Sequence, residues 1–510
     1  MGVLRRRGNV DHHPTRAAGG EEPDDRSSHL TNAAGMTLDG RSQPGIYLMT
    51  SLIDFVGNLG ERLSQFTQRW IPDSWVVCMS LTVIAILLAV FGADAGLNET
   101  VLAWGDGMWT LLELAMQFTI AMIAAHACVS SRPAFRFLDW LACRPDSARP
   151  VQAVVLLGAF SILIAYINWA ASVVASALFL PFIARRNPKA DVRVLIAAGY
   201  LGLGTVWHGG LSGSAPLILA TPGNPLTTPP SGTEPLLDRV LPVTETLFNS
   251  FNLTYLAIVS IVALGMVALL HPRRNARTLS EVELQQIMPA MPEEIEPTTP
   301  AARSEAFRGW IFLAVILIGY PLVHSIATKG FGASWTINAF NAVFLIGALL
   351  LQGRPANLVR AFGNGARTAS GVILQFPFYA GIFGIINGTG LGSWLGEFFV
   401  QIATTDTYPL IVYIYSGVVN VFVPSGGSKW LIEAPYLLPA ARELAVSPTT
   451  TLLAYCYGDS TSNLIQPFWA IPILTVTRMK FGDVLGYSGL VAAMLFVVTA
   501  VAMLIIPATL

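Results

Sequence analysis

The stretch VPSGGSKWLIEAPYLLPAAR, residues 423–442, lies within a long apolar run yet begins with a turn-forming PSGGS sequence and carries Lys429 and Glu433. Backbone that leaves a helix inside hydrocarbon exposes N–H and C=O groups. Each exposed group costs several kcal/mol unless the segment lines a water-filled cavity or is buried in protein. We therefore interpret the stretch as the tip of a helical hairpin at a polar binding site.

The composition of the whole chain indicates a polytopic membrane protein. Of 510 residues, 53% are hydrophobic and only 12% are charged, whereas about 25% are charged in soluble domains. The apolar runs have the length of about 20 residues that spans a bilayer. The chain has a formal net charge of −1 and little polar surface, so nucleic acid is not expected as a partner. The expected partner is the lipid bilayer.

The apolar segments fall into two kinds. Uninterrupted spans are predicted at 74–92, 108–129, 247–270, 308–327, 333–352, 369–389 and 484–507. Interrupted segments comprise two hairpins, 150–184 and 408–445, and two broken helices, 192–221 and 449–475. The interruptions are YINWAAS (166–172), WHGGLSGSAP (207–216), VPSGGSKW (423–430) and YGDSTSNLIQP (457–467).

The two sets of interrupted segments resemble each other, which predicts an internal repeat. LFLPFIARR (178–186) is similar to YLLPAAREL (436–444), and LIAAGY (195–200) is similar to LLAYCY (452–457) at nearly the same separation. Cytoplasmic loops carry the excess of Lys and Arg, which predicts a cytoplasmic N-terminus and an outside C-terminus. An odd number of spans then separates the copies, so the second is inverted, as in secondary transporters.

The predicted fold class is an all-α membrane protein with two inverted-topology repeats. We expect about nine transmembrane helices plus two re-entrant hairpins. The predicted parts are a disordered cytoplasmic tail (1–46), a first repeat (47–270), a cytoplasmic linker (271–307) and a second repeat (308–510). No cofactor and no metal site are expected.

Three motifs carry a resemblance to a known family. WHGGLSGSAPL, VPSGGSKW followed by EAPYLLPAA, and YGDSTSNLIQPFWAIPIL resemble the signatures of the bacterial short-chain fatty acid transporter family over about residues 50 to 507. That family belongs to the ion transporter superfamily of inverted-repeat anion carriers. The resemblance implies import of small monocarboxylates such as butyrate or acetoacetate across the cytoplasmic (inner) membrane, and it implies a homodimer.

One departure from the family pattern bears on the substrate. The family usually has a neutral GGGQW-like tip and a QGP-like continuation, whereas this chain has Ser428, Lys429 and Glu433. A charge at this depth costs about 2.5–3.5 kcal/mol on insertion scales, so an unpaired Lys429 is not expected. Three partners stay open for its ammonium: Glu433 one helical turn later, Asp459, or the substrate carboxylate.

The candidate site residues lie at the tips and breaks, where helix N-termini and hydroxyls suit a carboxylate. The predicted substrate-binding residues are Asn168, Ser172, His208, Gly210, Ser212, Ser214, Ser425, Gly426, Gly427, Ser428, Lys429, Asp459, Ser460, Thr461, Asn463 and Gln466. Asp459 and His208 are also the predicted residues that couple transport to H⁺ or Na⁺, because intramembrane acids are functional by default and histidine titrates near neutral pH.

Structural roles compete with these assignments. Asp459 is equally suited to cap a helix, His208 to donate across helices, and the Ser and Thr residues to hold helices together. Trp169, Trp207, Trp430 and Trp469 flank the breaks, where they suit either an acyl chain or ordinary packing.

Other functions fit the sequence less well. A dicarboxylate or other organic-anion carrier of the same superfamily is the main alternative. An intramembrane serine protease using Ser212 and His208 requires the imidazole within reach of the hydroxyl, and the intervening glycines disfavour this. A channel is a third possibility. No enzymatic activity is expected.

Overall fold

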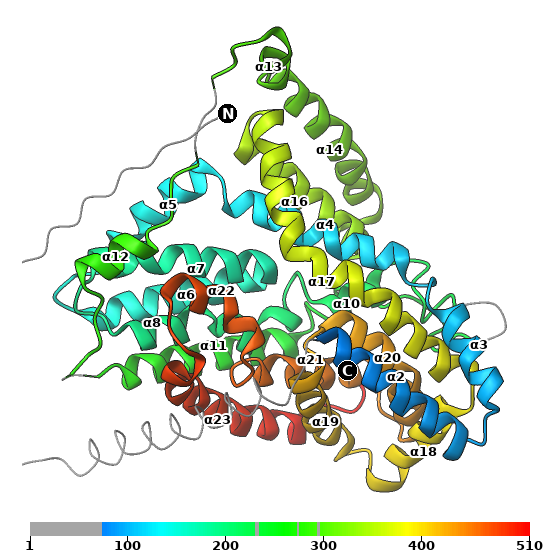
Figure 1. Ribbon diagram of the computed structural model, residues 1–510. Helices are drawn as coiled ribbons and strands as arrows, with labels where there is room; N and C mark the ends of the chain where they lie inside the picture. The colour runs from blue at the N-terminus through cyan, green and yellow to red at the C-terminus, as the bar shows by residue number, and fades with distance from the viewer. Residues whose placement is uncertain (1–73, 230–233, 273–274, 293–295) are drawn as a thin grey trace, which may run out of the picture. The chain divides into compact units, whose positions relative to one another are not determined.

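The computed structural model describes residues 74–229, 234–272, 275–292 and 296–510 (Figure 1). These residues form helices and connecting loops, and no strand occurs among them. The predicted tail at 1–46 lies outside the described residues.

The helices follow one another along the whole described chain. Those before the linker are α2 (Ser74–Phe91), α3 (Leu97–Gly107), α4 (Leu112–Val129), α5 (Arg132–Ala142), α6 (Pro150–Ile167), α7 (Trp169–Arg186), α8 (Val192–Gly199), α9 (Leu201–Thr205), η1 (Trp207–Gly209), α10 (Ser214–Ala220) and α11 (Ser250–Leu270). Those from the linker onward are α12 (Glu281–Ile287), α13 (Pro300–Glu305), α14 (Gly309–Lys329), α15 (Phe331–Ser334), α16 (Ile337–Gln352), α17 (Pro355–Gly388), α18 (Leu391–Ile402), α19 (Tyr408–Phe422), α20 (Gly426–Glu443), α21 (Pro448–Ser462), η2 (Phe468–Ala470), α22 (Ile471–Thr477) and α23 (Phe481–Ile505).

Seven of the described helices are long and apolar enough to cross a membrane. They include both arms of the first hairpin, α6 and α7, which pack against each other and are separated only by the extended residue Asn168. In the second hairpin, α19 and α20 are separated by residues 423–425. The segment 192–221 is divided into α8, α9, η1 and α10, and 449–475 into α21, η2 and α22.

The helices pack in two groups, and each group draws on both halves of the sequence. In one group α2, α3 and α4 pack on α17, while α16 packs on α4. In the other, α11 packs on α6 and α23, and α21 packs on α9 and α19. Contacts of α4 with α7 and of α17 with α20 join the two groups, so α4 and α17 lie next to the two hairpins (Figure 1).

The predicted linker 271–307 contains two short helices and is fastened to the helical body. Arg132 Nε donates to Pro292 O at 2.6 Å, and an Arg478 guanidinium nitrogen donates to Gln286 Oε1 at 2.7 Å. At the start of α12, the Ser280 N–H and hydroxyl donate to Glu283, and these bonds lower the pKa of that carboxyl group. The connector therefore has a defined path in its described parts.

The crossing of α3 and α17 depends on a close approach of backbones at Gly107. A Cβ built on Gly107 would lie 2.6 Å from both Ala380 O and Gly384 Cα, whereas one on Gly105 of the same helix meets nothing within 4 Å. Gly107 is a position where only a hydrogen fits.

We expect Gly107→Ala to separate α3 from α17 and to lower the midpoint of thermal denaturation in detergent by several degrees, because overpacking costs about 1–3 kcal/mol. Gly105→Ala is the matched control and should leave the midpoint unchanged or raise it, since alanine favours the helix. Equal midpoints for the two variants would contradict the packing argument.

Candidate functional site

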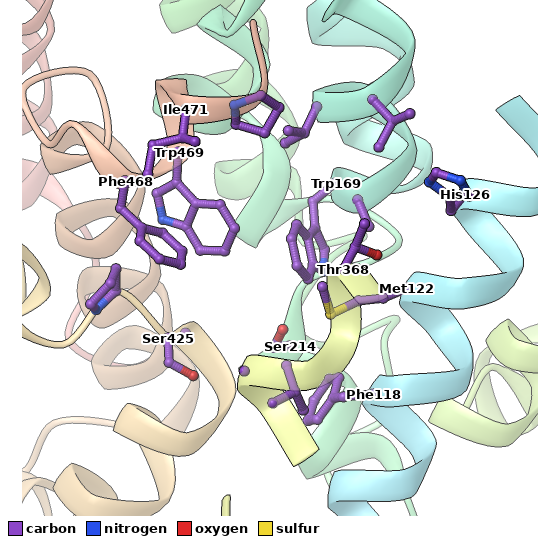
Figure 2. A pocket seen from close by; sticks show the side chains of 18 of the residues that line it. Phe118, Met122, His126, Trp169, Ser214, Thr368, Ser425, Phe468, Trp469 and Ile471 are labelled. Carbon is purple, nitrogen blue, oxygen red and sulfur yellow. The ribbon is translucent and has the colours of Figure 1, made fainter. Parts of the chain in front are cut away.

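Three of the four interruptions, and the residues directly after the fourth, border one pocket of about 450 Å³ (Figure 2). Trp169 and Ala170 come from the first hairpin tip, Trp207 and Ser214 from the first broken helix, and Phe468 and Trp469 from the second. The second tip contributes Pro424, Ser425, Gly426 and Gly427, and helices α4 and α17 contribute Phe118, Met122, His126, Thr368, Gln375, Phe376 and Tyr379. Segments from opposite ends of the sequence thus share one chamber.

Aromatic rings form much of the wall. Trp169 stands edge-on to Trp469, with ring centroids 5.2 Å apart, and edge-on to Trp207 at 5.8 Å. Phe468 packs edge-on against Trp469 at 5.0 Å. In Figure 2, Phe468 and Trp469 lie on the same side of the view as each other and next to Trp169, with Ser425 and Ser214 below. The pocket is therefore suited to an apolar group.

Two backbone N–H groups of the first hairpin tip have side-chain acceptors, although Asn168 Nδ2 has no hydrogen-bond partner among the described residues. Asn168 Oδ1 accepts from Ala171 N at 3.0 Å, and Ser212 Oγ accepts from Trp169 N at 3.0 Å. These bonds cap the N-terminus of α7, as asparagine commonly does. Asn168 and Ser212 are thus engaged in closing the tip.

The second tip leaves its N–H groups free. No side chain caps α20, and the hydroxyl of Ser425 instead hydrogen-bonds that of Ser428. Lys429 N makes the first bond, to Ser425 O at 3.0 Å, so the N–H groups of Gly426, Gly427 and Ser428 have no partner within the helix. An uncapped N-terminus of an 18-residue helix at a pocket wall has the geometry and dipole that favour an anion.

Behind this tip lies a buried ionic cluster. Lys429 Nζ is 3.2 Å from Asp459 Oδ1, and it donates to Ser416 O at 3.0 Å and to Ser416 Oγ at 2.8 Å. The same ammonium lies 4.4 Å from the centre of the Tyr455 ring. Of the three partners predicted for Lys429, the structure pairs it with Asp459.

His208 completes the cluster as a neutral imidazole. Its Nε2 accepts from Ala215 N at 3.2 Å, so the ring proton sits on Nδ1, which donates to Asp459 Oδ2 at 3.0 Å. Both ring nitrogens are therefore occupied. Ser212 instead donates to Ala165 O, so the His208–Ser212 pair that a serine protease requires is not formed.

The remaining predicted residues have local partners or pack beside the cluster. Ser172 Oγ donates to Ser161 O at 2.8 Å, and Thr461 Oγ1 donates to Tyr457 O at 2.9 Å. Asn463 donates to Leu203 O and accepts from Asn420. Gly210 fits closely under the backbone of Tyr166. Ser460 Oγ and Gln466 Oε1 are buried without a hydrogen-bond partner among the described residues.

Sequence reasoning missed two parts of the site. The first is the wall formed by α4 and α17, whose sequences read as plain spans. The only signals there are the isolated polar residues His126, Thr368 and Gln375. The second is Ser416, which binds the Lys429 ammonium from within an apolar helix.

Comparison with known proteins identifies the family. The model of a family described as "Short chain fatty acid transporter" matches residues 55–506. The chain belongs to the short-chain fatty acid transporter family. A relative from Escherichia coli strain K12 is 33% identical over 451 residues, covering 86% of this chain and 97% of the relative. One from Haemophilus influenzae is 31% identical over 440 residues, covering 85% and 96%. Both are named "Putative short-chain fatty acid transporter".

Two solved structures share the fold. The YdaH transporter of Alcanivorax borkumensis superposes with a TM-score of 0.54 at 15% identity, covering 85% of this chain and 98% of its own. MtrF of Neisseria gonorrhoeae, reported in a study of antimetabolite efflux pumps, superposes with a TM-score of 0.59 at 14% identity, covering 87% and 97%.

Membership of this family establishes the broad functional class of the protein. It is a multi-pass membrane transporter and not an enzyme, as the sequence predicted. The resemblance noted in its three motifs is likewise confirmed.

We expect the Lys429–Asp459 pair to behave as a unit in stability measurements. Lys429→Met alone should lower the midpoint of thermal denaturation markedly, because removing one member of a buried pair costs about 3–5 kcal/mol. Asp459→Asn alone should lower it less, because Glu433, one helical turn from Lys429, can then take the ammonium. The double variant should recover much of the loss that Lys429→Met causes. Arg185→Met, which breaks the half-exposed pair with Asp139, should have little effect. Additive losses in the double variant would show that the two charges do not interact.

Proposed function

We propose that this transporter imports short-chain monocarboxylates, such as butyrate or acetoacetate, by secondary active transport across the bacterial cytoplasmic (inner) membrane. The observation that carries the proposal is a single pocket that combines an uncapped helix N-terminus with an aromatic wall. A volume of about 450 Å³ lies within the range of about 300–1,000 Å³ usual for small-ligand sites.

The carboxylate of the substrate would bind at the second tip. The N–H groups of Gly426, Gly427 and Ser428 would donate to the carboxylate, and the positive end of the α20 dipole would stabilise its charge. Glycine at the first two positions allows the ligand to approach the backbone closely. The first tip offers fewer free groups because Asn168 and Ser212 already occupy its N–H groups.

The acyl chain would lie against the aromatic side of the pocket. Trp169, Trp469 and Phe468 provide apolar surface opposite the second tip. A dicarboxylate is disfavoured because no Lys or Arg among the described residues lines the pocket, and the ammonium of Lys429 is bound to Asp459 and Ser416 instead. A second carboxylate would have no partner among these rings.

The transport cycle we propose uses two inverted repeats, 47–270 and 308–510, with 150–184 and 408–445 as re-entrant hairpins. The tips meet at the substrate, and movement of one helical group against the other exposes it to each side in turn. The N-terminus is placed in the cytoplasm and the C-terminus outside by the distribution of Lys and Arg. Homodimers, as the family resemblance implies, would hold one group of helices fixed.

The proposed coupling ion is H⁺, with Na⁺ as the alternative. The Lys429 ammonium occupies the space beside Asp459 where a bound cation would otherwise neutralise the carboxylate. Asp459 and His208, the coupling residues predicted from the sequence, lie beside this ammonium and share a hydrogen bond of 3.0 Å.

Uptake of labelled solutes into proteoliposomes tests the proposal. Butyrate and acetoacetate should accumulate under an inward proton gradient, and an inward Na⁺ gradient at uniform pH should drive little uptake. Succinate should accumulate weakly, because the pocket offers one anion site. Preferred uptake of succinate would move the assignment to a dicarboxylate carrier, and dependence on Na⁺ alone would replace the proposed coupling ion.

The proposed anion site predicts the effect of a methyl group at Gly426. A Cβ there would lie 2.5 Å from the Trp207 ring and 2.6 Å from His208 Cε1, so Gly426→Ala should displace the tip. We expect the KM for butyrate uptake to rise at least about tenfold, the loss of about 1.4 kcal/mol of binding. Gly363→Ala on α17, where a Cβ meets nothing within 4 Å, is the control and should transport normally. An unchanged KM in Gly426→Ala would remove this tip from the substrate site.

A further inference from the structure

Glu433 is a buried acid for which the structure provides no partner. It lies on α20 with 1% of its surface exposed, and neither carboxylate oxygen has a hydrogen-bond partner among the described residues. An isolated ionised carboxylate is very costly in an apolar interior, so such a group takes a proton instead. The second acid of the cluster, Asp459, has both Lys429 and His208 beside it.

The positive and negative charges around Glu433 balance only when Glu433 itself is neutral. The titratable groups that act on it electrostatically are Lys429 and Tyr436 on its own helix, Tyr415 on α19, and Asp459 and Tyr455 on α21. Lys429 is the sole cation among these groups, and its ammonium is committed to Asp459 and Ser416. One positive charge balances one carboxylate, and Glu433 is the surplus acid.

The other helices packed on α20 do not change this balance. Helix α10, with the sequence SAPLILA, has no titratable side chain. On α18 the acid is Glu397, and on α17 the cations are Arg360 and Arg367; all three are exposed at the surface. His208 reaches the cluster from η1, but its two nitrogens are already bonded to Ala215 and Asp459. Protonation of Nε2 would set two donors against each other.

We infer that Glu433 is the residue that carries the coupling proton, an inference that rests on the proposed monocarboxylate import. In this structure the proton is held as the carboxylic acid O–H of Glu433. When the site opens to the cytoplasm, the proton leaves to water and the Glu433 carboxylate takes the Lys429 ammonium, one helical turn away. Asp459 then keeps its bond from His208 and is solvated by the water that enters. A proton from water on the outside then restores the acid, and Lys429 returns to Asp459.

One helix thereby links the two cargoes. The free N–H groups at Gly426–Ser428 and the proton site at Glu433 lie on α20, about 10 Å apart along its axis at 1.5 Å per residue. The substrate crosses as a carboxylate and the proton on Glu433, so a cycle moves no net charge. Uptake should therefore respond to the pH gradient and little to membrane potential.

Transport by Glu433→Gln in proteoliposomes tests the assignment, because glutamine mimics the protonated acid. Exchange of external labelled butyrate for internal butyrate should persist, since the loaded carrier keeps its proton throughout. Accumulation driven by the pH gradient should fall at least tenfold. The matched control, Glu443→Gln, changes an exposed acid at the end of the same helix and should accumulate butyrate as the wild type does. Gradient-driven accumulation by Glu433→Gln would overturn the inference, as would loss of exchange in a folded variant.

Infrared spectroscopy of the purified protein supplies a test that needs no substrate. The wild type at neutral pH should show the C=O stretch of a protonated carboxylic acid, absent in Glu433→Gln and present in Glu443→Gln. Asp459→Asn should weaken that band, because it frees Lys429 to pair with Glu433. A wild-type protein without the band overturns the inference. If the band behaves as expected but the wild-type protein exchanges no butyrate, the proton site stands and the proposed substrate is wrong.

Discussion

The site depends on one constraint: backbone that leaves a helix inside a membrane protein must find partners for its N–H and C=O groups. The two hairpin tips meet this constraint differently. At the first, Asn168 and Ser212 accept the N–H groups of Ala171 and Trp169. At the second, Ser425 bonds Ser428 instead, and the turn keeps its donors for a ligand. Two similar segments therefore differ in what they offer: the first tip has acceptors for two of its N–H groups, and the second is the proposed anion site.

The buried charges behind the second tip also need ionic or hydrogen-bond partners. Lys429 is acceptable at this depth because Asp459, two oxygens of Ser416 and the Tyr455 ring surround its ammonium. Asp459 is acceptable because Lys429 and His208 neutralise and bond it. Glu433 has neither kind of support. In the proposed mechanism a bound proton neutralises Glu433 in place of an ionic partner. Coupling to a proton gradient requires a group of this kind, which releases its proton to water and takes it up again.

Sequence reasoning located the interruptions but not the partners across them. Turn residues and charges in apolar runs are visible locally, so the tips near Asn168 and Ser425 and the breaks near His208 and Asp459 could be predicted. Whether Lys429 would pair with Glu433 or Asp459 depends on how α20 rotates against α19 and α21. Ser416 and the pocket wall on α4 and α17 are equally invisible, because their sequences are those of ordinary spans and only packing brings them to the pocket.

The placement of both proposed sites on α20 has a mechanical consequence. Helix α20 packs against α17, α18 and α21, and α21 also contacts η1 and α9. A shift of α20 relative to α21 would alter the Lys429–Asp459 distance and the geometry of the Gly426–Ser428 tip together. Proton release and substrate release would then be two results of one movement. This favours coupled transport over independent binding, because a single shift of α20 changes the surroundings of both cargoes.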